Sequence, residues 1–159
     1  MPNVPYLLID GLWHLALALW VGGSAVTTFV VAPTVFGKAP TRALAGEIVG
    51  EILRRQGLLT LGCLVVLAAS GGTRAAIWEN PVWPAVLRYS LLGVAMILAL
   101  IGIVGLGPAV RRLRASFGRP IDEVPEDDPK RQAFRRLHGL SMAVNLFQLL
   151  LASLVFFLG

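Results

Sequence analysis

Charged residues are scarce in this chain of 159 residues: 14% are Asp, Glu, Lys or Arg, against roughly 25% in an ordinary soluble domain. Hydrophobic residues reach 56%, and the mean hydropathy is +0.74. So low a charge content excludes both a disordered chain and a water-soluble domain. Because the length fits one domain, we expect a single transmembrane domain over residues 1–159.

Cysteine, histidine and methionine are also few, with 1, 2 and 3 residues. Cys63 lies in an apolar run, which excludes an intrachain disulfide and a cysteine-based metal site. The segment Met1–Asp10 contains no Lys or Arg, so the first apolar segment lacks the basic start of a secretory signal and is interpreted as a retained span. No phosphate loop, dinucleotide fingerprint or nucleophile–base pair is present, and we expect no enzymatic activity.

Four long apolar segments dominate what is present. They cover residues 6–36, 57–77, 86–110 and 137–158. Each reaches about the 20 residues that a helix needs to cross a hydrocarbon core of about 30 Å. Because backbone groups in lipid have to be hydrogen-bonded internally, the sequence predicts an all-α, four-helix transmembrane bundle. No internal repeat is evident between its two halves.

The loops between these segments differ sharply in charge. The loops at residues 37–56 and 111–136 carry 4 and 8 Lys or Arg residues, whereas the third holds only Arg74 and Arg88. The positive-inside rule therefore predicts a multi-pass protein of the bacterial inner membrane, with both basic loops cytoplasmic and both termini outside. Lipid head groups account for the net charge of +5, so we expect the lipid bilayer, and no nucleic acid, as a partner.

Residues 41–56 in the first basic loop predict an amphipathic helix. Its apolar side chains recur at helical spacing, and Glu47, Glu51, Arg54 and Arg55 share the opposite face. The helix either lies in the membrane interface or continues into the second span. Glu47 and Glu51 are four residues apart and can bind a hard metal cation, but the adjacent arginines also fit a solvated charged face.

Polar side chains inside the last span form a narrow stripe. At 100° per residue, the four residues fall within an arc of about 80°: His138, Ser141, Asn145 and Gln148. Polar groups in a span usually face a protein interior or a water-filled cavity, because exposing them to lipid is costly. The stripe is therefore either a set of interhelical hydrogen bonds or a surface that contacts a ligand or an ion.

A second candidate site lies at the start of the first span. Asp10 and His14 are four residues apart, so the carboxylate can orient the imidazole for proton acceptance or cation binding. The alternative is a helix cap beside an interfacial histidine. We expect His14 and His138 to lie about 15–20 Å apart along the membrane normal, too far for one metal ion or a bis-histidine haem. A haem with one axial histidine remains open.

Two stretches of the chain resemble a known family. The first includes Trp20-Val21-Gly22-Gly23, Val31-Ala32-Pro33 and Ala45-Gly46-Glu47, and the second includes Phe134-Arg135-Arg136-Leu137-His138-Gly139. Together they are similar to the bacterial four-helix membrane family of unknown function related to vertebrate transmembrane protein 205. The resemblance implies a small helical bundle. The vertebrate member is associated with resistance to platinum drugs, which implies export or trafficking of metal-containing compounds.

The Trp-Val-Gly-Gly run is also similar to the membrane domain of copper-resistance D proteins. The four-helix plan with an early histidine is similar to that of the haem-containing membrane protoporphyrinogen oxidases. The chain departs from a copper-handling pattern, because its only methionines are Met1, Met96 and Met142 and it has no multi-histidine motif.

These observations lead to one main hypothesis and two alternatives. The main hypothesis is a homo-oligomeric membrane protein that binds or transports a small cation or small molecule along the stripe, with Asp10 and His14 at the outer mouth. An oligomer is expected because four helices leave little room for a pathway within one protomer. The alternatives are a haem- or metal-binding membrane redox protein and a structural or assembly subunit. No cofactor is assigned.

Overall fold

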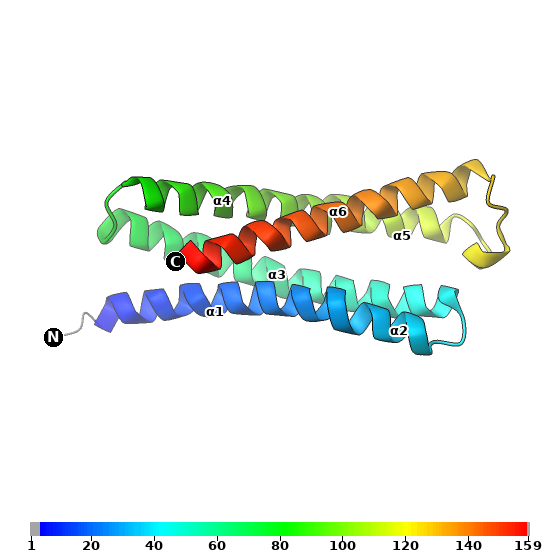
Figure 1. The fold of residues 1–159 in the computed structure, drawn as a ribbon, viewed down its shortest axis with the longest axis horizontal. Helices are drawn as coiled ribbons and strands as arrows, with labels where there is room; N and C mark the ends of the chain where they lie inside the picture. Colours follow the sequence, from blue (N-terminus) through cyan, green and yellow to red (C-terminus); the bar gives the residue numbers. More distant parts are fainter. Residues whose placement is uncertain (1–3, 159) are drawn as a thin grey trace.

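The protein, in a computed structural model that describes residues 4–158, consists mainly of four long helices (Figure 1). The described residues contain no strand, and the predicted all-α fold is confirmed. The first and third long helices each have three parts, and a short 3-10 turn (Ile121–Glu123) precedes the last helix. The helical elements are α1 (Val4–Val26), η1 (Thr27–Val31), α2 (Ala32–Lys38), α3 (Arg42–Ile77), α4 (Trp83–Leu100), η2 (Ile101–Leu106), α5 (Gly107–Ala115) and α6 (Pro129–Leu158).

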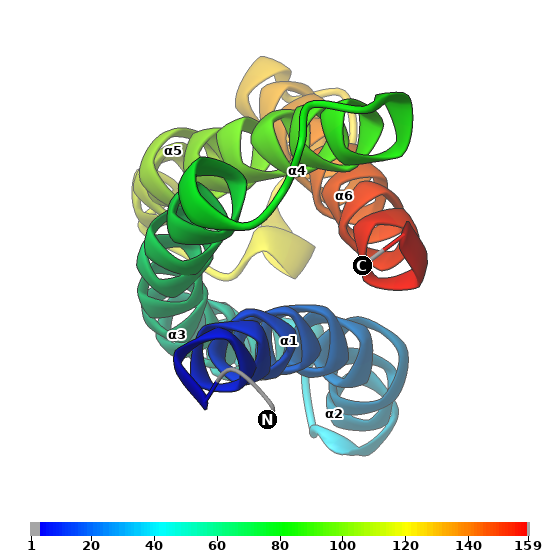
Figure 2. The ribbon, with the colours of Figure 1, turned by 90° about the vertical axis from the view of Figure 1, so that its left-hand side faces the viewer.

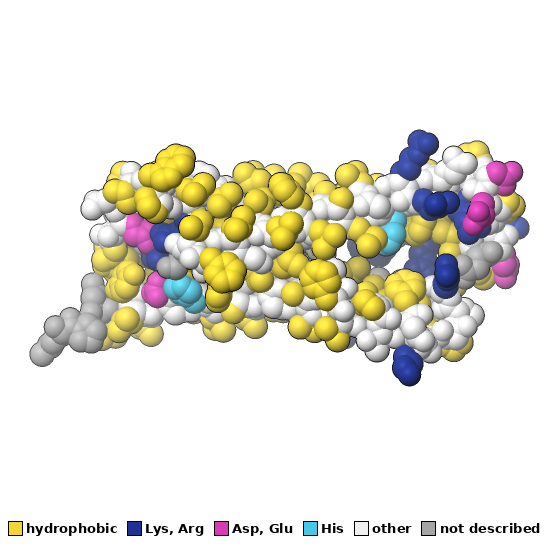
Figure 3. Space-filling view, in the orientation of Figure 1, with side chains coloured by type: hydrophobic (Ala, Val, Ile, Leu, Met, Phe, Trp, Pro, Cys, Tyr) yellow, Lys and Arg dark blue, Asp and Glu magenta, His cyan; other side chains and the backbone are white. Residues whose placement is uncertain are grey.

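Each of the four long helices is long and apolar enough to cross a membrane. They contain between 30 and 36 residues, and at about 1.5 Å per residue they exceed a hydrocarbon core of about 30 Å. Hydrophobic side chains cover the middle of the bundle, and charged side chains gather at its ends (Figure 3). The helix ends therefore extend beyond the hydrocarbon core into the polar region of the membrane.

The amphipathic segment is the first part of the second span. Thr41 caps α3 by accepting a hydrogen bond from the backbone N–H of Leu44, and the helix then runs without a break to Ile77. Of the two predicted arrangements for residues 41–56, continuation into the span is therefore the one observed. The predicted loop at residues 37–56 shrinks to a short connection between Lys38 and Arg42.

The helices form two antiparallel pairs. α1 packs chiefly on α3, and α4 packs chiefly on α6, while α6 also contacts α1 (Figures 1 and 2). Val4 and Leu158 lie at one end, which we call the terminal end (Figure 1). The α2–α3 and α5–α6 connections lie at the other, which we call the basic end because residues 111–136 carry eight Lys or Arg residues.

Two of the long helices contain a π-helical turn directly before a proline. At the end of η1, the N–H of Ala32 donates to the carbonyl oxygen five residues earlier, and Pro33 follows. At the end of η2, the N–H of Gly107 does the same, and Pro108 follows. Proline has no N–H and its ring clashes with the carbonyl four residues before it, so the wider turn relieves the clash. Each half of the chain thus pairs a proline-containing span with an uninterrupted one, a repetition that the sequence analysis missed.

The core is built around Trp13 of α1, which is fully buried together with Leu17 and Leu67. Gly71 of α3 makes this packing feasible, since a Cβ atom at Gly71 would overlap the indole ring. A glycine that allows two helices to approach closely is typical of membrane bundles, where packing rather than the hydrophobic effect holds helices together.

Gly71→Ala is expected to lower the free energy of unfolding by about 1–3 kcal/mol, because the added methyl group forces Trp13 out of place. Gly72→Ala is the matched control: nothing lies within 4 Å of its added Cβ, so it should be neutral or stabilising by up to about 1 kcal/mol. Denaturant titration in mixed micelles measures both. Equal stability of the two variants would contradict the close approach.

Candidate functional site

A chain of three polar side chains links the last helix to the first. Nε2 of Gln148 donates a hydrogen bond to Oδ1 of Asn145 at 2.9 Å, and Nδ2 of Asn145 donates to Oγ1 of Thr28 at 3.1 Å. Thr28 lies in η1, so the π-helical turn before Pro33 carries the residue that meets α6. We call Thr28, Asn145 and Gln148 the polar seam.

Two amide side chains in the described part of the bundle keep a buried atom without a hydrogen-bond partner. Gln148 is 8% exposed, and its Oε1 accepts no bond. Nε2 of Gln56 is also buried and donates none, next to Gly23 of α1. Leaving such a group unpaired costs about 1–3 kcal/mol. A bound molecule with hydrogen-bonding groups would recover this cost.

The face of α6 that carries the polar stripe is covered at the terminal end and open at the basic end. On this face Ala152 is 1% and Val155 is 0% exposed, whereas His138 is exposed. α2, which follows the π-helical turn, packs on α3 rather than on α6. Figure 3 shows a hollow between the two layers at the basic end, bordered by basic side chains. Asn145 lies about two helical turns along α6 from His138, on the same face and toward the terminal end.

The structure therefore brings together only part of the predicted stripe. Asn145 and Gln148 belong to the polar seam, and Ser141 is half-buried between them and the basic end. The ring of His138 stacks on Phe134, with centroids 5.8 Å apart and planes 4° from parallel. His138 is thus a residue of the hollow and not of the hydrogen-bonded chain.

Arg114 reaches across the basic end from α5 to α3. Its guanidinium group donates a hydrogen bond to the backbone oxygen of Ala43. It also fills the space next to Gly46, where a Cβ atom would lie 2.7 Å from Nη1. The ion pairs found among the described residues involve other cations, so no described carboxylate neutralises Arg114.

A second group of polar residues lies at the terminal end. Glu79 accepts hydrogen bonds from Arg74, from Arg88 and, at 2.9 Å, from the hydroxyl of Tyr89. Oδ1 of Asp10 lies 3.1 Å from Nη1 of Arg74. The two arginines are only 3% and 8% exposed. We call these five residues the charge cluster.

The charge cluster surrounds Trp13 and joins all four long helices. Cζ of Arg74 lies 5.1 Å from the indole centroid and Cζ of Arg88 lies 5.9 Å from it, within cation–π range. Arg88 also contacts the carbonyl oxygen of Leu158 at 3.5 Å, where the negative end of the α6 dipole favours a cation. The terminal end of the bundle is held together by these contacts.

The expectation that Arg74 and Arg88 lie in a loop is wrong. Arg74 lies in the last turn of α3 and Arg88 inside α4. A usable signal was present, because an arginine within an apolar segment has to find a partner or reach the interface. Gln56 was missed for a similar reason: it was counted with the first basic loop, whereas α3 carries it into the bundle.

The predicted Asp10–His14 pair forms, but the carboxylate of Asp10 also forms an ion pair with Arg74. Nδ1 of His14 lies 2.9 Å from the backbone oxygen of Asp10 and 3.4 Å from its Oδ2. His14 also contacts Phe156 edge-on. His14 and His138 lie near opposite ends of the bundle, so the fold does not bring them to one metal ion or haem.

The carboxylates of the amphipathic segment lie on an exposed face. Glu51 accepts hydrogen bonds from both Arg54 and Arg55 at 2.8 Å, and Glu47 is exposed nearby. The interpretation as a solvated charged face fits this geometry. Among the residues described, no group of three or more His, Cys, Asp or Glu residues is placed to hold a metal ion.

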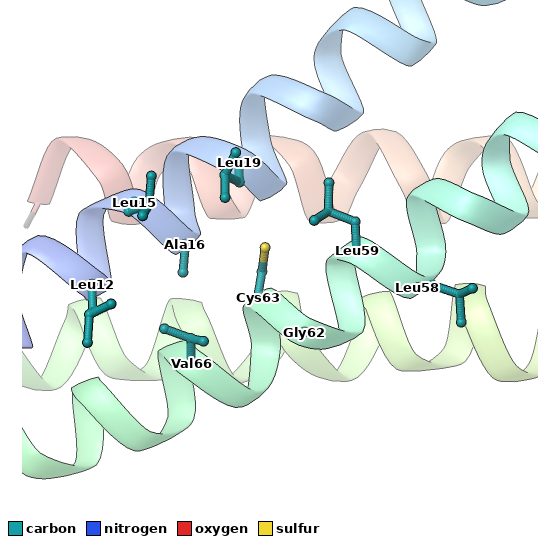
Figure 4. Close-up of a pocket in the computed structure, with 9 residues that line it drawn as sticks. All are labelled: Leu12, Leu15, Ala16, Leu19, Leu58, Leu59, Gly62, Cys63 and Val66. Carbon is teal, nitrogen blue, oxygen red and sulfur yellow. The ribbon is translucent and has the colours of Figure 1, made fainter.

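An apolar groove of about 370 Å³ lies between α1 and α3 on the outer surface of the bundle (Figure 4). Its walls are leucine and valine side chains, and its floor contains Ala16, Gly62 and Cys63. Apart from the Cys63 thiol, these side chains provide van der Waals contact and no hydrogen bonds. The groove is typical of a surface that packs against acyl chains.

These features define a four-helix, membrane-spanning bundle with a charge cluster at one end and an open hollow at the other. Residues 15–117 match the model of DUF4149, a domain of unknown function, and the chain belongs to this family. The match includes Arg74, Arg88 and Arg114. Comparisons with curated proteins and with solved structures find no match. The relation to transmembrane protein 205 stays a prediction.

Proposed function

We propose that this protein, without acting as an enzyme, binds a small polar molecule at the polar seam and passes it to or from the basic end. The observation that carries the proposal is the hydrogen-bonded chain Thr28–Asn145–Gln148, half-buried at Thr28 and Asn145, which ends in a buried and unpaired Gln148 Oε1. Interhelical packing explains the two hydrogen bonds. It does not explain why a buried amide oxygen of Gln148 is left unpaired, and a ligand that donates to this oxygen does.

Electrostatics favour a small polar molecule as the ligand over a small cation, the other ligand in the main hypothesis from the sequence. Basic side chains border the hollow, and Arg114 lies at the same end without a described carboxylate partner. A positive surface lowers the local concentration of cations and raises that of anions, while leaving uncharged molecules unaffected. The ligand of this proposal is therefore uncharged or anionic.

The proposal includes an orientation in the bacterial inner membrane. The excess of Lys and Arg at residues 37–56 and 111–136 supports a cytoplasmic basic end, which leaves both chain ends outside. The hollow then opens toward the cytoplasm, and the charge cluster faces the outside. The homo-oligomer expected from the sequence belongs to the same proposal, because a second protomer would line the open side of the hollow. No specific observation favours the haem-binding or the assembly alternative.

Asn145→Leu is expected to reduce solute flux about tenfold or more, because it removes the central residue of the polar seam. The wild-type protein in phosphatidylcholine vesicles should increase permeability to urea or to inorganic phosphate above that of protein-free vesicles. Stopped-flow light scattering measures the flux of urea, of inorganic phosphate and, as the cation for comparison, of K⁺. Circular dichroism checks that the variant is folded.

Phe147→Leu provides the matched control, because Phe147 lies on the exposed side of the same helix. This variant should retain wild-type flux. The proposal fails if Asn145→Leu conducts as well as the wild type, since the polar seam would then only pack the helices. It also fails if the wild-type protein adds no permeability to either solute.

A further inference from the structure

Arg114 differs from most basic residues at the basic end in its burial and its direction. Six of the eight basic residues at positions 111–136 are exposed, whereas Arg114 and Arg131 are half-buried, and Arg114 points across the bundle to α3. Gly46 leaves the space that its guanidinium group occupies. The side chain is thus held inside the basic end instead of extending into solvent.

The guanidinium group of Arg114 makes fewer hydrogen bonds than it is able to donate. A guanidinium group has five N–H donors arranged as a planar fork, and the backbone oxygen of Ala43 is the acceptor found for Arg114. None of the buried, unpaired side-chain atoms found among the described residues belongs to Arg114, so its remaining N–H groups are accessible to a ligand. The two-pronged geometry of the fork matches a phosphate or a carboxylate.

Arg114 and two residues of the polar seam lie on helices that pack together, α5 and α6. His138 shares its face of α6 with Asn145 and Gln148, about two helical turns toward the basic end, where α5 carries Arg114. An elongated ligand is therefore able to place one group at Arg114 and another at Gln148. The first position selects a negative charge, and the second selects a hydrogen-bond donor.

We infer that the ligand carries an anionic group, a phosphate or a carboxylate, which Arg114 binds within the hollow. This inference rests on the proposed function of the polar seam and narrows its ligand class. The anionic group belongs either to a free solute or to a lipid head group that enters from the side of the bundle. Both sources present the same chemistry to the guanidinium fork.

Thermal unfolding of the whole protein in nanodiscs tests the inference. One series adds inorganic phosphate to phosphatidylcholine nanodiscs, with potassium chloride at equal ionic strength as the salt control. A second series replaces part of the phosphatidylcholine with phosphatidylglycerol. Because a ligand that binds the folded state raises the unfolding midpoint, the wild-type Tm should rise in at least one series. A rise with phosphate identifies a free anion, and a rise with phosphatidylglycerol alone identifies a lipid head group.

Arg114→Gln should weaken the apparent affinity for phosphate or phosphatidylglycerol at least tenfold, because it removes the charge-assisted hydrogen bonds. Arg112→Gln is the matched control: it makes the same charge change at an exposed site on the same helix and should respond as the wild type does. Gly46→Ala serves as a second variant that keeps the arginine but displaces its guanidinium group, and it should weaken the response in the same direction.

The inference is overturned if the wild-type Tm rises in neither series, or if Arg114→Gln and Gly46→Ala both respond as the wild type does. Asn145→Leu could lose flux while Arg114→Gln and Gly46→Ala keep the wild-type rise in Tm. This result would overturn only the inference that the ligand carries an anionic group bound by Arg114. The proposed function of the polar seam would then stand with an uncharged ligand.

Discussion

Replacing Glu79 with alanine is expected to lower the free energy of unfolding by about 3–5 kcal/mol, because it leaves buried positive charges uncompensated. Glu79 accepts hydrogen bonds from Arg74, Arg88 and Tyr89 at once, and its side chain is only 18% exposed. Asp10 still contacts Arg74 in this variant, but Arg88 loses its only described carboxylate partner. Denaturant titration in mixed micelles measures the loss.

Glu126→Ala is the control for this experiment. Glu126 also pairs with an arginine, Arg131 at 3.5 Å, but its side chain is 82% exposed. Exposed ion pairs contribute about 0–1 kcal/mol, so the loss should be small. If Glu79→Ala were no more destabilising than Glu126→Ala, the charge cluster would not hold the terminal end together.

Trp13→Ala is expected to lower the free energy of unfolding by about 3–5 kcal/mol, through the cavity that it leaves and the cation–π contacts that it removes. The side chain is fully buried and contacts both guanidinium groups of the charge cluster. The same unfolding measurement applies. Trp83→Ala is the matched control, because Trp83 is 74% exposed and its loss should change stability by about 0.5 kcal/mol or less.

The two substitutions are expected to be non-additive, because Trp13 and Glu79 act through the same pair of arginines. Residues in one network typically show interaction energies of about 0.5–3 kcal/mol in a double-mutant cycle. The double variant should therefore be more stable than the sum of the two losses predicts. Strict additivity would show that the indole ring and the carboxylate stabilise the bundle independently.

The contrast between the two ends of the bundle bears on the proposed function. At the terminal end, Glu79 and Trp13 contact Arg74 and Arg88, and the contacts of these two arginines involve all four long helices. At the basic end, α2 turns away from α6 and leaves the stripe face open as far as the polar seam. A ligand at Asn145 is therefore expected to exchange through the basic end, with the charge cluster as the closed end.

Much of the fold follows from the order of residues along the chain. The four spans and the helical start of the second span need only local hydropathy and periodicity, because a helix in lipid satisfies its own backbone and each segment is long enough alone. The orientation of Asn145 and Gln148 toward the protein interior also follows from helical periodicity. Their partner Thr28 does not, because it lies 117 residues away from Asn145 in the sequence.

The sequence by itself determined that this protein is an all-helical bundle with four spans and that Asn145 and Gln148 on the last span turn inward, since hydropathy and a period of 3.6 residues act within one segment. Only the tertiary structure decided which polar residues meet. In the structure, Arg74 and Arg88 lie in helices and not in a loop. His138 is not part of the hydrogen-bonded chain that contains Asn145, and the side chains of Gln56 and Arg114 are half-buried in the bundle. These outcomes depend on how the helices pair and where the turn before Pro33 directs the chain, and contacts between distant segments have no signature in local sequence.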